Sequence, residues 1–309
     1  MIIPKQLKYI ALIMLASGTI VLSCKKVTDE PKLTDIRLSA YLSNQDYNDF
    51  PLMGQKCDFG IYVTEEGTEK VVNDYSNLRF QTKFKAGIMQ LSPSADFQFF
   101  YPEEEKMVDI AGYYPYNSEL TADHPYYLVN LTDQNALEPE ILLIAKASGS
   151  NSVLNKALLP LKSAYSKLNI SVKLNENTPD ATDMPVELVL NKVASCAELN
   201  ILNGEYTSLS TGSSVILQGS NSSAHSHHAI VIPQVLSEDA ELSVNYPESE
   251  SVKSQSIRLK DFISSFEVNK QYDIDIFVSP QGVNAELVKV SELYISDWNE
   301  DSEIITDKI

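Results

Sequence analysis

Hydrophobic and polar residues alternate along most of the chain from residue 36 onward. Successive side chains of a strand point to opposite faces of a sheet, so this period of two predicts strands with one buried face. Residues 168–174 show it most clearly, because four aliphatic residues are separated there by Asn169, Ser171 and Lys173. The same pattern predicts strands at residues 36–42, 59–63, 186–190, 242–246 and 272–278.

The alternating segments are short, and long stretches of helical periodicity are missing from the sequence. Strands without intervening helices favour antiparallel β-sandwiches over a parallel sheet. The small and polar residues 147–152 predict a linker between a closing strand at 141–145 and a second apolar run at 157–161. We therefore expect an all-β protein with an N-terminal sandwich at 35–150 and a C-terminal sandwich at 151–309.

The first 24 residues have the pattern of a lipoprotein signal. Lys5 and Lys8 precede an uncharged run at 9–22 that is shorter than the ~20 residues a membrane-spanning helix needs. The V-L-S-C sequence of residues 21–24 resembles a bacterial lipobox, which predicts removal of residues 1–23 and lipidation of Cys24. An ordinary secretory peptide with an incidental cysteine is the alternative, and two lysines directly after Cys24 favour the lipobox. Residues 24–34 are polar and predict a tether.

The net charge of the chain argues against one class of partner, and the cysteine content bears on whether a disulfide forms. The chain carries 42 acidic and 24 basic residues, for a net charge of −18 at pH 7. Binding to nucleic acid depends on basic side chains that release counterions, so we expect no nucleic-acid partner. Cys57 and Cys196 remain after processing, and an envelope compartment would permit a disulfide between them. Their expected positions in different domains favour two buried free thiols.

The sequence contains no catalytic or cofactor-binding signature such as G-x-S-x-G, H-E-x-x-H or a P-loop. We therefore expect neither an enzyme nor a cofactor. His225, His227 and His228 form the one cluster of metal-type ligands, but zinc needs a fourth ligand, so an exposed loop that binds only adventitious metal is the preferred interpretation. The aromatic residues at 113–116 predict packing at a sandwich edge, with sugar stacking as the alternative.

Several segments together resemble the fimbrillin family of Bacteroidales, especially its Mfa-like branch. Their order and spacing carry the resemblance, although a tryptophan and a Gly-Asp pair common in the family are missing from the second segment. The segments are I-R-L-S-A-Y-L at 36–42, G-Q-K-C-D-F-G-I-Y-V at 54–63, A-G-Y-Y-P-Y at 111–116, E-I-L-L-I-A-K-A at 140–147, L-L-P-L-K-S-A-Y-S-K-L-N-I-S-V at 158–172, I-V-I-P-Q at 230–234, N-K-Q-Y-D-I-D-I at 269–276 and I-S-D-W at 295–298.

The resemblance implies two transthyretin-like β-sandwich domains and export as a lipoprotein to the outer membrane. It also implies assembly into a fimbria as stalk, tip or anchor, by strand donation after a protease removes the amino-terminal strand. The expected partners are other fimbrial subunits, the membrane through Cys24, and a ligand on a host or bacterial surface. The alternative function is a surface glycan-binding lipoprotein in which Tyr126 and Tyr127 stack on sugar rings.

Two segments are candidates for assembly. Arg37 is the one arginine before residue 79, and a trypsin-like cut there would free the chain from its lipid and open a groove. The alternative is an outward-facing strand residue in an anchor that is never cut, and the alternation of Arg37 with its neighbours favours it. The C-terminal segment 286–309 is expected to close the second sandwich as far as Trp298, with the residues beyond it left to contact a neighbouring subunit.

Overall fold

The computed structural model describes residues 35–43, 52–72, 74–95, 97, 99–101, 106–132, 134, 140–150, 156–174, 186–210, 214–220, 223–248, 251–279 and 282–293. Within these ranges the chain forms strands and one short 3₁₀ helix, η3 (Leu259–Asp261), with no α-helix. The prediction of an all-β protein is therefore confirmed. The predicted signal peptide, Cys24 and the tether lie outside the described residues.

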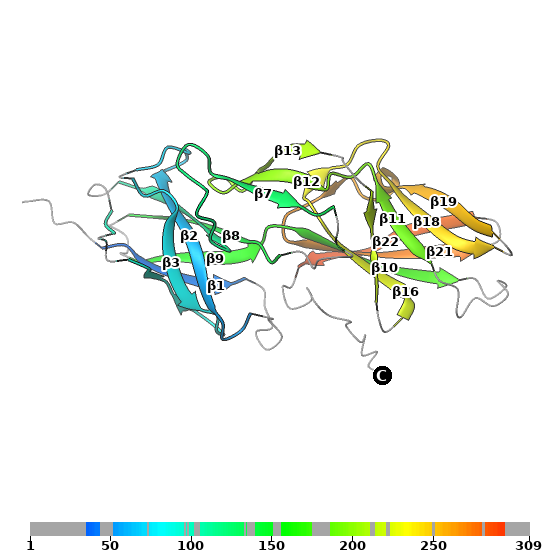
Figure 1. The fold of residues 1–309 in the computed structure, drawn as a ribbon, viewed down its shortest axis with the longest axis horizontal. Helices are drawn as coiled ribbons and strands as arrows, with labels where there is room; N and C mark the ends of the chain where they lie inside the picture. Colours follow the sequence, from blue (N-terminus) through cyan, green and yellow to red (C-terminus); the bar gives the residue numbers. More distant parts are fainter. Residues whose placement is uncertain are drawn as a thin grey trace, which may run out of the picture. The chain divides into compact units, whose positions relative to one another are not determined.

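Eight strands form the first sheet, in the order β4-β1-β9-β8-β6-β2-β3-β5. Figure 1 shows most of them in blue to green. Their bounds are β1 (Arg37–Leu42), β2 (Lys56–Glu65), β3 (Leu78–Lys83), β4 (Met89–Gln90), β5 (Ser92–Pro93), β6 (Val108–Tyr114), β8 (Leu143–Gly149) and β9 (Lys156–Ser163).

The first core lies inside this sheet. Phe80 of β3 and Met89 of β4 belong to the same buried cluster although their strands stand near opposite ends of the strand order. The sheet therefore folds over on itself as a sandwich does. Phe59 on β2 is fully buried at its centre, with its ring 5.8 Å from Phe84 in an edge-to-face contact.

Two further sheets face each other across the second core. The five-stranded sheet has the order β15-β16-β10-β21-β22, and the four-stranded sheet has the order β14-β11-β18-β19. Their alternating apolar side chains meet in one buried cluster. Their bounds are β10 (Ser166–Leu174), β15 (Gln218–Ser220), β16 (Ser223–Val231), β21 (Lys270–Ser279) and β22 (Gly282–Glu292), and β11 (Glu187–Asn191), β14 (Val215–Ile216), β18 (Glu241–Glu248) and β19 (Ser251–Arg258).

A three-stranded sheet, β13-β12-β7, covers the outer face of the first sheet. Its strands are β7 (Tyr126–Asn130), β12 (Cys196–Asn200) and β13 (Tyr206–Ser210), while β17 (Gln234–Val235) pairs with β20 (Ser265–Phe266). The third core joins Tyr62 and Tyr113 of the first sheet to Leu199 and to Ile232. Strand β7 thus pairs with a strand that lies far later in the sequence.

Two features of the strands differ from the sequence predictions. The sheets are not purely antiparallel, because β1 pairs in parallel with β9 and β10 pairs in parallel with β21. Long connections between these partners make the parallel pairs feasible. Residues 147–149, part of the predicted linker, lie in β8 instead, where Ala147 packs beside the first core. The division at residue 150 stays a prediction, while β9, which follows it, pairs with β1 and β8.

Candidate functional site

Strand β1 is the candidate site, because it fills a slot between two other strands. It pairs in parallel with β9 from Arg37 to Leu42, and antiparallel with the two residues of β4. Further backbone hydrogen bonds run from the Ile36 N–H to the Phe99 carbonyl (2.7 Å) and from the Ser43 N–H to the Leu161 carbonyl (2.8 Å). Without β1, the edge of β9 would carry unpaired N–H and C=O groups.

The inner face of β1 contributes directly to the first core. Ile36, just before β1, and Leu38, Ala40 and Leu42 within it alternate along the chain and have exposed fractions of 6% or less. Burying an aliphatic side chain of this size contributes roughly 1.5–3 kcal/mol, so the three larger ones together supply about 5–9 kcal/mol. That is a large part of the ~5–15 kcal/mol that stabilises a whole domain. A chain deprived of β1 therefore needs a replacement strand.

Arg37 stands at the first position of β1 with an exposed side chain, in register with Lys156. A protease that cuts after Arg37 must draw the backbone into its own site, so β1 has to leave its pairing first. Such a cut would leave residues 38–42 attached to the rest of the chain. The slot would then open only when another strand displaces them.

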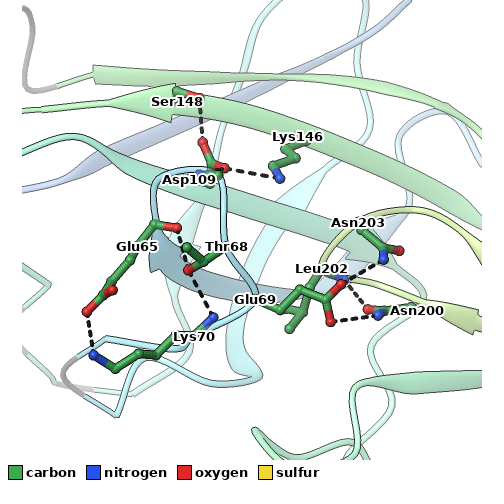
Figure 2. Close-up of polar contacts among 11 residues, drawn as sticks. Glu65, Thr68, Glu69, Lys70, Asp109, Lys146, Ser148, Asn200, Leu202 and Asn203 are labelled. Atoms are coloured by element: carbon green, nitrogen blue, oxygen red, sulfur yellow. Dashed lines mark hydrogen bonds and ion pairs between the residues drawn. The ribbon is translucent and has the colours of Figure 1, made fainter.

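A network of charged and amide side chains fixes the hairpin that follows β2 (Figure 2). The Asp109 carboxylate accepts hydrogen bonds from the Ser148 hydroxyl (2.6 Å) and the Gly67 N–H (3.0 Å), and lies 3.1 Å from the Lys146 ammonium. Burial alone would raise the pKa of Asp109, but these donors and the cation outweigh it and hold the pKa below its ordinary value.

Glu69, at the tip of the same hairpin, binds the turn between β12 and β13. Its carboxylate accepts hydrogen bonds from Nδ2 of Asn200 (3.0 Å) and Nδ2 of Asn203 (2.8 Å), and Figure 2 shows both side chains pointing toward it. Asn200 is buried, and its Oδ1 accepts the Leu202 N–H at 2.9 Å. The hairpin therefore ties the first sheet to the three-stranded sheet, a contact that no sequence motif indicates.

The predicted packing of the aromatic residues at 113–116 is confirmed for Tyr113, which is fully buried. Its hydroxyl donates to Asn77 Oδ1 at 2.7 Å, and burial raises its pKa well above the ordinary value. A Cβ added to Gly60 would lie 1.9 Å from Cε1 of Tyr113, so only glycine leaves room for this ring. The Tyr113 ring also lies edge-on to Tyr127, with ring centroids 6.0 Å apart.

The two tyrosines of the glycan-binding alternative are only partly exposed. The Tyr127 hydroxyl donates to Glu140 at 3.2 Å, and burial raises the Tyr127 pKa above its ordinary value. The Tyr126 ring lies 5.4 Å from the ring of His124. Tyr127 is thus occupied by packing within the chain, which leaves Tyr126 as the more accessible ring.

The histidine segment does not form the exposed loop that its composition suggests, and that interpretation is wrong. Residues 223–231 form β16, in which His227 faces inward with an exposed fraction of 5% and His228 is partly buried. His227 alternates with Ala229 and Val231 on the core side, a pattern hidden by the serine-rich residues that precede it. The structure does not describe the side chain of His225. Across the described ranges, no three His, Cys, Asp or Glu side chains are grouped as metal ligands.

Cys57 and Cys196 are both free thiols, as expected, but the expected burial is found for Cys57 and not for Cys196. Cys57 is buried, and this burial raises its pKa to about 11, so the thiol stays protonated and unreactive. Cys196 is only partly buried, and its Sγ lies 3.5 Å from Asn130 Oδ1.

The last described strand, β22, pairs along its length with β21, and Leu293 after it is fully buried. The second sandwich is therefore closed by the chain's own strand as far as Glu292, and Leu293 packs in the third core. Trp298 and the remaining residues to 309 lie outside the described part of the chain. No helix in the described ranges is long and apolar enough to cross a membrane.

Comparison with known proteins places this architecture in a family. The sequence model of the fimbrillin-like family matches residues 49–298. The chain belongs to the fimbrillin-like family. No curated protein sequence matches this fimbrillin-like chain. The family match supports a structural or adhesive role in fimbriae, and it implies a surface appendage as the location and other fimbrial subunits as partners.

Solved structures share the fold of this fimbrillin-like chain at low sequence identity. A Bacteroides uniformis protein described as a cell adhesion protein has 19% identity and a TM-score of 0.62, covering 86% of this chain and 98% of its own. The tip fimbrial protein Mfa3 of Porphyromonas gingivalis, with C-terminal truncation, has 7% identity and a TM-score of 0.51, covering 84% and 99%. A fimbrial assembly protein of Parabacteroides distasonis has 12% identity and a TM-score of 0.51, covering 84% and 98%.

Proposed function

We propose that this chain is a non-enzymatic fimbrial subunit, tethered to the outer membrane through a lipid on Cys24, that joins its neighbours by strand donation. The observation that carries the proposal is β1: one strand of six residues seals a buried core and an otherwise unpaired sheet edge. A donated strand with aliphatic residues at alternate positions offers the same backbone hydrogen bonds and the same core contacts.

The lipid-anchored form keeps its own β1 in this proposal, with the bond after Arg37 intact. The pairing of β1 on both sides supports this, because a paired strand resists proteolysis. A chain that retains β1 can donate a strand but cannot accept one, which suits an anchor. A chain cut after Arg37 can accept one and suits a stalk or tip.

Intact-mass analysis of the chain recovered from fimbriae and from the membrane fraction tests this assignment. A lipid-modified mass beginning at Cys24 in both fractions supports the anchor. A fimbrial chain that begins at Leu38 refutes it and favours a stalk or tip subunit. Replacing Cys24 with Ala should release the protein from the membrane fraction and abolish incorporation of labelled palmitate, and unchanged labelling would refute lipidation at Cys24.

The alternative, a surface glycan-binding lipoprotein, is favoured by the partly exposed Tyr126 ring. Binding of the purified chain to a glycan array, lost in Tyr126→Ala, would support it. Concentration-dependent polymers without glycan binding would support strand donation.

A further inference from the structure

A cavity of about 400 Å³ lies where the chain leaves the described structure. Glu292, the last residue of β22, lines this cavity, and so does Asn269. The backbone N–H of Leu293 donates to the Asn269 carbonyl at 2.8 Å, and Asn269 Nδ2 donates to the Glu292 carboxylate at 2.8 Å. These bonds fix the point from which residues 294–309 continue, directly at the cavity wall.

The wall of the cavity combines apolar side chains with two lysines. Lys146 of β8 and Lys162 of β9 stand on one side, in a chain whose acidic residues outnumber its basic ones by 42 to 24. Lys146 is already paired with Asp109 and Glu292 with Lys270, so Lys162 is the cation of this wall that an acidic segment can meet. The apolar lining consists of Ile144, Ala145, Pro160, Ile201, Leu202 and Val268.

The sequence that follows Leu293 matches this lining. Residues 294–298 read Y-I-S-D-W, with three large apolar or aromatic side chains around one acid. Further acids follow at Glu300 and Asp301, and the next basic residue is Lys308. Five extended residues span about 16 Å, so the segment is long enough to cross the cavity from its fixed starting point.

We propose that residues 294–298 fold back into this cavity of their own chain, with Trp298 as the apolar anchor and Asp297 beside the Lys162 ammonium. Burial of an indole ring supplies a large apolar contact, and the nearby lysine selects the acidic segment over other apolar peptides. Residues 299–309 then extend as an arm from a fixed point. This inference concerns the single chain and does not depend on strand donation.

Tryptophan fluorescence tests the proposal directly, because Trp298 is the chain's one tryptophan. The sample is the purified chain from residue 25 to 309, measured over a range of concentrations with acrylamide as quencher. We expect emission at shorter wavelength than in urea and severalfold weaker quenching, both independent of protein concentration. Lys162→Glu should raise the quenching severalfold. Lys156 is also exposed on the same strand but lies outside the cavity, so Lys156→Glu should leave the quenching unchanged.

Three results would overturn the proposal. Quenching of the native chain as strong as in urea would mean that Trp298 is solvent-exposed. Equal quenching in wild type, Lys162→Glu and Lys156→Glu would separate Trp298 from the cavity. Protection of Trp298 from quenching that increases with protein concentration would mean that the segment binds the cavity of a second copy of the chain. Circular dichroism checks that each variant folds. If the reversed charge beside Glu292 prevents folding of Lys162→Glu, Lys162→Ala takes its place.

Discussion

Removing packing contacts between β1 and the first core should expose the bond after Arg37 to trypsin. Leu42 lies at the end of β1 with an exposed fraction of 1% and is five residues from the scissile bond, so its replacement leaves the residues beside that bond unchanged. A buried Leu→Ala change costs about 2–5 kcal/mol. At about 3 kcal/mol, the population of chains with β1 released rises roughly 150-fold in Leu42→Ala.

The assay is limited trypsin digestion of the native chain from residue 25, with the product that begins at Leu38 quantified by mass spectrometry. The cleavage rate follows the released population when re-closing is faster than cleavage. Leu168→Ala is the matched control, because Leu168 is fully buried in the second core. Both variants should lose similar stability in urea, but only Leu42→Ala should release the new terminus much faster. Equal acceleration in the two variants would mean that β1 opens only when the whole chain unfolds.

Three further predictions concern stability and the C-terminus. Asp109→Asn should lower the free energy of unfolding in urea by about 1–2 kcal/mol at pH 7, because the Ser148 and Gly67 donors lose a charged acceptor while Lys146 stays in contact with water. Because the folded pKa of Asp109 is depressed, this stabilisation is fully present above the unfolded pKa of about 3.9 and is lost as pH falls through the folded pKa. A stability difference between wild type and Asp109→Asn that is unchanged at pH 2 would contradict the reasoning. Gly60→Ala should lower the free energy of unfolding by roughly 3 kcal/mol, because the new Cβ displaces Tyr113. Gly54→Ala, whose Cβ meets no atom within 4 Å, should lower it by only about 1–2 kcal/mol through backbone strain. Equal losses of stability in the two variants would exclude the steric explanation. Deleting residues 300–309 should leave the melting transition unchanged and reduce co-purification with other fimbrial subunits, and a lowered transition would place those residues in a core.

The strands could be predicted from the sequence because alternation is a local property. The run at 168–174 becomes β10, and 272–278 becomes part of β21. The side chains that face the second core are Leu168, Ile170 and Val172 of β10 and Ile274, Ile276 and Val278 of β21. Alternation also explains the buried and exposed faces of β1. It states which face of a strand is buried, but it carries no information about which strand lies beside it.

The parts that escaped prediction depend on contacts between distant residues. The parallel pairing of β1 with β9 joins residues that lie more than a hundred positions apart. Glu69 is an exposed acid in a turn, and only the fold brings it to Asn200 and Asn203. The inward position of His227 was hidden because serine and glycine nearby suggest a loop, while burial depends on the core that β16 joins.

The most direct test of strand donation is sedimentation velocity of two chains, one from residue 25 to 309 and one from residue 43 to 309, with and without a peptide of residues 35–42. The account predicts that the longer chain is monomeric at every concentration. The chain without β1 should form polymers that grow with concentration, and the added peptide should return it to a folded monomer by filling the slot. A truncated chain that stays a folded monomer and does not bind the peptide, or one that unfolds and is not restored by it, would contradict the claim that β1 is a replaceable strand.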